Sequence, residues 1–132
     1  MFEKILLALR QPGDIAQIVK FLKNKNEKPA LVLLYLVPSD FVRDSVVSFE
    51  TASRTNDMSR EIANNLTSFD YELVEKKYDA SFFPATIVSK EALERKCEAI
   101  FVLSRGDKGL FEADFASSIV LESTIPVLVI RN

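Results

Sequence analysis

The chain has 132 residues, 48% of them apolar and 27% charged, and its formal net charge is −2. These values are typical of a single soluble globular domain, here residues 1–132, and the lack of a long basic run argues against a nucleic-acid partner. No apolar run reaches the roughly 18 residues that a transmembrane helix needs, so we expect no membrane insertion.

Apolar runs of strand length alternate with amphipathic segments from the N-terminus onward. The run KILLAL, residues 4–9, predicts a strand that is covered on both faces. Asp14 is interpreted as the N-cap of the first helix, which spaces apolar residues at i, i+3, i+4 and i+7 from Ile15 to Leu22. A second strand with apolar residues on both faces is predicted over residues 30–37.

The middle of the chain is less regular. Residues 38–50 predict a long loop that closes over the C-terminal crevice of the sheet. Residues 51–67 keep helical spacing, and the more polar run over residues 71–78 predicts a strand at a sheet edge. A further helix is predicted to begin at Pro84 and to run to about residue 96.

The C-terminal third continues the alternation. It predicts a strand over residues 98–103, a helix over residues 111–123 and a last strand over residues 125–132. Within the preceding helix, Glu91 and Arg95 are four residues apart and are interpreted as an ordinary ion pair on the helix surface. Strands that alternate with helices indicate right-handed βαβ units and a parallel sheet.

Five segments of the chain, in this order, resemble those of the universal stress protein family: EKILLAL, LVLLYLVP, FPATIVSKEAL, AIFVLSRG and STIPVLVIR. The resemblance implies an α/β fold with a five-stranded parallel sheet of order 3-2-1-4-5 and two helices on each face. It also implies a soluble, usually dimeric protein of the stress response. Some members of the family bind ATP or AMP and others do not.

The nucleotide-binding motif of that family is only half present. Binding members carry Gly, two residues, Gly, nine residues, and then Gly followed by Ser or Thr. Aligned with this chain, these positions fall on Leu103, Gly106, Ala116 and Ser117. The leucine adds a bulky side chain where a glycine would admit the triphosphate, whereas the alanine adds only one methyl group.

The adenine end of the expected site also departs from the family. The aspartate that ends the first strand in binding members is replaced by Arg10, whose side chain can only donate hydrogen bonds, and Leu36 replaces a valine beside the base. Arg105, Lys108 and the serines near a helix N-terminus offer donors to a small anion, and the alternative is a solvated polar turn. The residues of this degenerate nucleotide site are Ala8, Leu9, Arg10, Leu36, Val102, Leu103, Arg105, Gly106, Ala116, Ser117 and Ser118.

The chain lacks the residues that most catalytic mechanisms require. Without histidine the chain has no Ser-His-Asp or Cys-His mechanism and no His-based zinc site. The lone Cys97 excludes an internal disulfide and a thiolate cluster, suits a reducing compartment, and is predicted to be a half-buried small hydrophobe. We therefore expect a cytoplasmic protein without enzymatic activity, catalytic residues or a metal site.

The last strand carries a continuous apolar run at a predicted sheet edge. Such an edge invites pairing with another chain, so we expect a homodimer through Pro126, Val127, Leu128, Val129 and Ile130. The function we expect is stress-linked regulation through dimerisation and an unidentified protein partner. The alternative is a sensor that binds AMP or ATP in an altered pocket.

Overall fold

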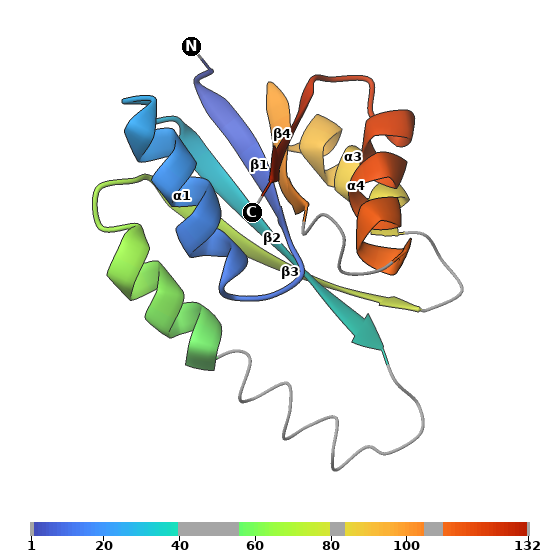
Figure 1. Ribbon diagram of the computed structural model, residues 1–132, viewed down its shortest axis with the longest axis horizontal. Coiled ribbons are helices and arrows are strands. Elements are labelled where there is room, and N and C mark those ends of the chain that lie inside the picture. Colours follow the sequence, from blue (N-terminus) through green and yellow to red (C-terminus); the bar gives the residue numbers. More distant parts are fainter. Residues whose placement is uncertain (1, 40–55, 80–83, 105–109, 132) are drawn as a thin grey trace.

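The computed structural model describes residues 2–39, 56–79, 84–104 and 110–131. Its strands are β1 (Lys4–Leu9), β2 (Ala30–Ser39), β3 (Tyr71–Asp79), β4 (Ala99–Ser104) and β5 (Val127–Arg131). They pair in parallel in the order β3-β2-β1-β4-β5, around which the rest of the chain is arranged (Figure 1). The predicted parallel sheet and its strand order are confirmed.

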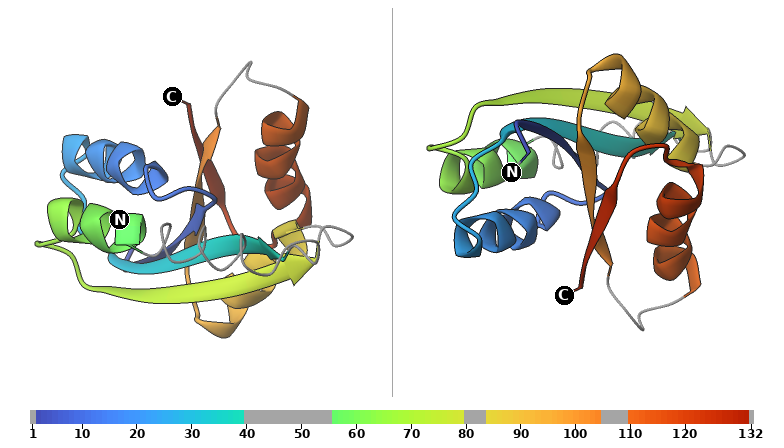
Figure 2. Two further views of the ribbon diagram at one scale, coloured as in Figure 1. Left: turned by 90° about the horizontal axis from the view of Figure 1, so that it is seen from below. Right: turned by 90° about the horizontal axis from the view of Figure 1, so that it is seen from above.

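Helices cover both faces of the sheet. One face carries α1 (Asp14–Asn24) and a helix over residues 56–65, and the other carries α3 (Pro84–Glu94) and α4 (Leu110–Glu122) (Figure 2). The prediction of two helices on each face is thus confirmed. None of the helices in the described ranges is both long and apolar enough to cross a membrane.

The core consists of two apolar clusters, one on each face of the sheet. Ile5, Leu7 and Leu9 belong to the cluster under α1 and residues 56–65, whereas Leu6 and Ala8 belong to the cluster under α3 and α4. Successive side chains of a strand point to opposite faces, so β1 contributes to both clusters. This double coverage explains why its sequence is apolar without alternation.

β2 extends further than the sequence predicts. It pairs with β1 only as far as Tyr35 but with β3 as far as Ser39, so Pro38 lies in the strand opposite Tyr78 rather than at the start of a loop. Beyond Tyr35 the strand has one strand neighbour among the described residues, and such an edge position tolerates the missing N–H of proline. The rest of the predicted loop, residues 40–50, and the predicted helical residues 51–55 lie outside the described residues.

β3 forms one edge of the sheet, as its polar sequence predicts, and is tied to α3 by ion pairs. The predicted pair of Glu91 and Arg95 forms, but its expected position on the surface is wrong, because the Glu91 side chain is only 7% exposed. Its Oε1 lies 3.2 Å from Nζ of Lys76 on β3, and its Oε2 accepts a hydrogen bond from Nε of Arg95 at 2.8 Å. Arg95 Nη1 also lies 3.0 Å from Oε2 of Glu72. The pair has helical spacing, but its helix face is turned toward β3.

Candidate functional site

The expected nucleotide site lies where the direction of the chain through the sheet changes. From β1 the chain passes through β2 to β3 at one edge and returns through β4 to β5 at the other. In open α/β sheets, ligands bind outside the carboxyl ends of the strands at this switch point. β1 and β4 are neighbours there, paired as far as Ala8 and Val102. The candidate crevice therefore lies just beyond these two residues.

Four of the predicted site residues come together in one buried cluster. Ala8, Leu36, Val102 and Ala116 all belong to the apolar cluster under α3 and α4, and none is more than 4% exposed. Leu9 does not join them, because it belongs to the cluster on the opposite face. Residues expected at the base (Leu36) and at the phosphates (Ala116) thus lie in the same apolar cluster.

The phosphate end of the expected site is described only in part, since Arg105, Gly106 and Lys108 lie outside the described residues. Leu103 is 8% exposed and stands opposite Ile130 of β5. It succeeds Val102 in the strand and so points to the other face of the sheet.

The two serines of the expected site lie in the interior of α4. Ser117 is exposed and Ser118 is half-buried. α4 begins at Leu110, about two turns before these serines. The free N–H groups of a helix belong to its first turn, so those of α4 lie well before Ser117 and Ser118. Their role in nucleotide binding stays a prediction.

Phe115 of α4 is a residue of this crevice that sequence reasoning missed. Its ring is 7% exposed and packs in the same cluster as Ala8 and Leu36. Cζ of Arg10, at the end of β1, lies 4.9 Å from the centroid of that ring. A guanidinium group over an aromatic face is attracted by the ring quadrupole. The cation that replaces the aspartate of binding family members therefore bridges β1 and α4. The four-residue spacing of Phe115 and Ile119, which places both on one helix face, was the sequence signal that Phe115 is buried.

Asp14 holds the turn that carries Arg10, and the prediction that it is an N-cap is wrong. Gly13 occupies the cap position without a side-chain hydrogen bond, and Asp14 is the first residue of α1. Its carboxylate, 4% exposed, accepts hydrogen bonds from the backbone N–H groups of Arg10 at 3.2 Å and Gln11 at 3.3 Å. These two N–H groups lie between β1 and α1, where strand and helix bonding provide no backbone acceptor. The Asp14 side chain turns back and accepts their hydrogen bonds instead. The backbone at Arg10 is thereby fixed.

Other reactive groups lie away from the crevice. Cys97 precedes β4 and packs in the cluster under α3 and α4 as the predicted small hydrophobe, but it is buried at 6% exposure rather than half-buried. Burial raises the pKa of its thiol, which keeps the group protonated near neutral pH. Across the part of the chain that the structure describes, no three His, Cys, Asp or Glu side chains gather as a metal site.

β5 forms the second edge of the sheet and carries the surface expected at a dimer contact. In the described ranges its only strand neighbour is β4. Leu128 and Val129 are each 37% exposed, whereas Val127 and Ile130 are half-buried against the two core clusters. Pro126, just before the strand, is exposed. Apolar side chains are thus accessible on both faces of this edge.

These features define an α/β protein built on a parallel sheet of order 3-2-1-4-5, and this is the fold of the universal stress proteins. The hypothetical protein MJ0577 matches with a TM-score of 0.71 and 21% identity over 100% of this chain and 97% of that one. UspA from Lactobacillus plantarum matches with a TM-score of 0.67 and 18% identity over 97% of each chain. A universal stress family protein from Arabidopsis thaliana, solved with AMP bound, matches with a TM-score of 0.65 and 13% identity over 98% of this chain and 91% of that one.

The likeness is one of structure rather than of sequence. Universal stress proteins solved with dAMP and with cAMP share the fold at TM-scores of 0.55 and 0.57. No family model matches the sequence, and no curated protein matches it either. The predicted resemblance to the universal stress proteins is therefore confirmed at the level of the fold.

Proposed function

We propose that this protein is a non-catalytic regulatory domain of the universal stress type that acts by associating with itself and with a protein partner. In this proposal the crevice at the carboxyl ends of the strands does not bind a nucleotide. The observation that carries it is the contact between the Arg10 guanidinium and the Phe115 ring, 4.9 Å from Cζ to centroid.

This contact supports a closed crevice for two reasons. First, Arg10 cannot accept the hydrogen bond that an aspartate would accept from adenine. Second, a ligand that entered between β1 and α4 would have to displace a cation–π contact, which stabilises by about 0.5–1 kcal/mol at an exposed site and more when desolvated. Arg10 is half-buried, and Asp14 holds its backbone, so moving the side chain costs additional free energy.

The exposed edge of the sheet supports the association. β5 offers a row of backbone groups with no strand neighbour among the described residues, together with the exposed Leu128 and Val129. Edge strands with few charges and no bulge pair readily with a second chain, and in β5 only Arg131, at its last residue, is charged. A two-fold contact between two β5 strands would bring the same apolar patch of each copy together.

Calorimetric titration with Mg-ATP and with AMP tests the proposal. We expect no dissociation constant tighter than about 100 μM, roughly −5.5 kcal/mol. The variant Arg10→Ala removes the guanidinium, and Lys20→Ala, on an exposed position of α1, is the matched control for a lost positive charge. A low-micromolar dissociation constant for the unmodified protein would overturn the closed crevice.

A second candidate function, a sensor of AMP or ATP with an altered pocket, is favoured by one observation. Arg10 places a cation at the mouth of a crevice whose fold binds AMP, dAMP or cAMP in other proteins. A guanidinium that leaves Phe115 would pair well with a phosphate. In the same titration this function requires AMP to bind to the unmodified protein and to lose affinity in Arg10→Ala but not in Lys20→Ala.

A further inference from the structure

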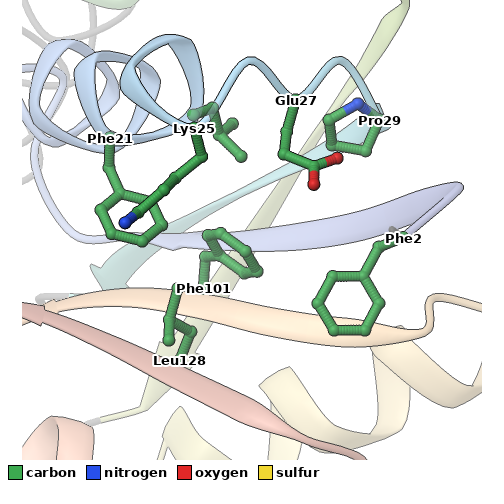
Figure 3. Close-up of a pocket in the computed structure, with 8 residues that line it drawn as sticks. Phe2, Phe21, Lys25, Glu27, Pro29, Phe101 and Leu128 are labelled. Carbon is green, nitrogen blue, oxygen red and sulfur yellow. The ribbon is translucent and has the colours of Figure 1, made fainter.

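A pocket of about 310 Å³ opens on the α1 face of the sheet, at the end opposite to the nucleotide crevice (Figure 3). Phe2 and Pro29, which line it, precede β1 and β2, so the pocket lies at the amino ends of the strands. The crevice of Arg10 and Phe115 lies beyond their carboxyl ends. The pocket is therefore separate from the nucleotide crevice, although its lining residue Leu128 also belongs to the β5 edge proposed for self-association.

The arrangement of helices explains why a hollow forms here. On this face α1 packs against β1 and β4, and no described helix of this face lies over β5 (Figure 2). The exposed Leu128 of β5 thus borders a space whose other wall is the last turn of α1. The pocket is a notch between helix and sheet rather than a flat surface.

Three aromatic rings from separate segments shape the interior. Phe101 of β4 lies between Phe2 and Phe21, with centroid separations of 6.3 Å and 6.2 Å and interplanar angles of 86° and 71°. Such edge-to-face contacts hold the rings in fixed relative orientations. Phe101 is only 4% exposed, so the base of the pocket belongs to the core. An apolar ligand would meet a preformed surface and pay little to order it.

The rim of the pocket carries one charge of each sign. Nζ of Lys25 lies 5.7 Å from the centroid of the Phe21 ring. The carboxylate of Glu27 stands away from this ammonium group, toward Pro29 and Phe2 (Figure 3). The charges are therefore separated along the opening, with the cation beside the aromatic wall.

The backbone of the rim is fixed by the way α1 ends. Asn26 has a positive φ of 57°. Its N–H donates to the carbonyl of Lys23, and the N–H of Glu27 donates to the carbonyl of Leu22, both at 3.0 Å. This pair of bonds is a Schellman motif, which closes the helix with a defined turn. Lys25 and Glu27 thus project from an ordered segment.

We propose that this pocket binds a small apolar monocarboxylate. Its ring or branched body would lie against Phe2, Phe21 and Leu128, and its carboxylate would pair with the Lys25 ammonium group. The volume lies at the small end of the range for ligand pockets, which suits a single ring with a short chain.

Nuclear magnetic resonance with methyl-labelled leucine tests the site, with phenylbutyrate as the probe and phenylbutanol as its uncharged counterpart. We expect saturable shifts of the Leu22 and Leu128 methyl groups. The carboxylate should bind about two- to fivefold more tightly than the alcohol, as for a partly exposed ion pair. Lys25→Gln should abolish this preference, whereas Lys20→Gln, an exposed lysine of the same helix, should keep it.

Each of three results would overturn the proposal. The first is the absence of saturation by either probe up to about 10 mM. The second is equal binding of the acid and the alcohol by the unmodified protein, or a preference that survives in Lys25→Gln. The third is a shift of the Leu22 methyl group, which lies on α1 away from the β5 edge, with protein concentration alone, because it would mean that a second copy of the chain covers the pocket.

Discussion

Replacing Glu91 by glutamine removes a buried charge that ties α3 to the edge strand β3. The side chain is 7% exposed, and its oxygens lie 3.2 Å from Nζ of Lys76 and 2.8 Å from Nε of Arg95. A hydrogen bond to a charged group stabilises by about 1.5–3 kcal/mol. The partner side chains are 45% and 31% exposed, so solvent screens both pairs. We therefore expect Glu91→Gln to cost about 1–2 kcal/mol and to lower Tm by about 4–7 °C.

The pH dependence of this loss follows from the pKa of Glu91. Burial alone would raise that pKa, but the hydrogen bonds and charges of Arg95 and Lys76 outweigh it, and the pKa is lowered. A carboxyl group whose pKa is lower in the folded state stabilises the protein above its unfolded pKa, near 4.3. This contribution is lost as the pH falls through the folded pKa. The difference between wild type and Glu91→Gln should be full at pH 7 and should shrink below about pH 4.

Urea denaturation followed by circular dichroism, at a series of pH values from 7 down to about 3.5, measures both effects. Glu94→Gln on the same helix is the control, since its pair with Lys90 is 3.9 Å long and its side chain is 57% exposed. We expect this control to change stability by less than about 0.5 kcal/mol. The reasoning fails if Glu91→Gln is no more destabilising than Glu94→Gln, or if its cost is the same at both ends of the pH range.

Three other substitutions or modifications probe the crevice, the edge and the core. The triple variant Arg10→Asp, Leu103→Gly, Ala116→Gly should bind ATP at least about tenfold more tightly in calorimetry, roughly 1.4 kcal/mol, and unchanged affinity would show that other features close the crevice. Val129→Asp should convert a dimer to a monomer in light scattering, because two carboxylates would meet near the two-fold axis. A wild-type mass of 14.9 kDa in the same measurement, which is that of one chain, would contradict the dimer. Cys97 should react with a thiol reagent at pH 8 about 100-fold more slowly in the folded than in the urea-unfolded protein. The reason is that burial raises the pKa of the thiol and limits access of the reagent. Equal rates would contradict the burial of Cys97.

The strands and helices were predictable because their signals are local. The apolar run of β1 coincides with the strand Lys4–Leu9, and Pro84 begins α3 as proline in a first helical turn should. The C-terminal end of β2 was not predictable in this way. Its last residues are held by β3, far along the chain, so Pro38 lies in a strand although its own sequence signals a break.

The polar contacts of the site required the three-dimensional structure. Asp14 has the composition of an N-cap, and only the path of the chain after β1 turns its carboxylate back to the N–H groups of Arg10 and Gln11. Glu91 has a helix neighbour in Arg95, but its burial depends on Lys76 of β3. A pattern within one helix cannot reveal a partner from another element. Helical periodicity likewise shows that Phe115 faces the core, but not that it meets Arg10.

A crystal structure of the protein grown with millimolar ATP tests the closed crevice most directly. We predict that the Arg10 guanidinium will stay over the Phe115 ring and that no nucleotide will lie beyond the carboxyl ends of β1 and β4. An adenine ring seated beside Ala8, Leu36 and Val102, with Arg10 turned away from Phe115, would contradict the central claim that this fold acts here without its nucleotide.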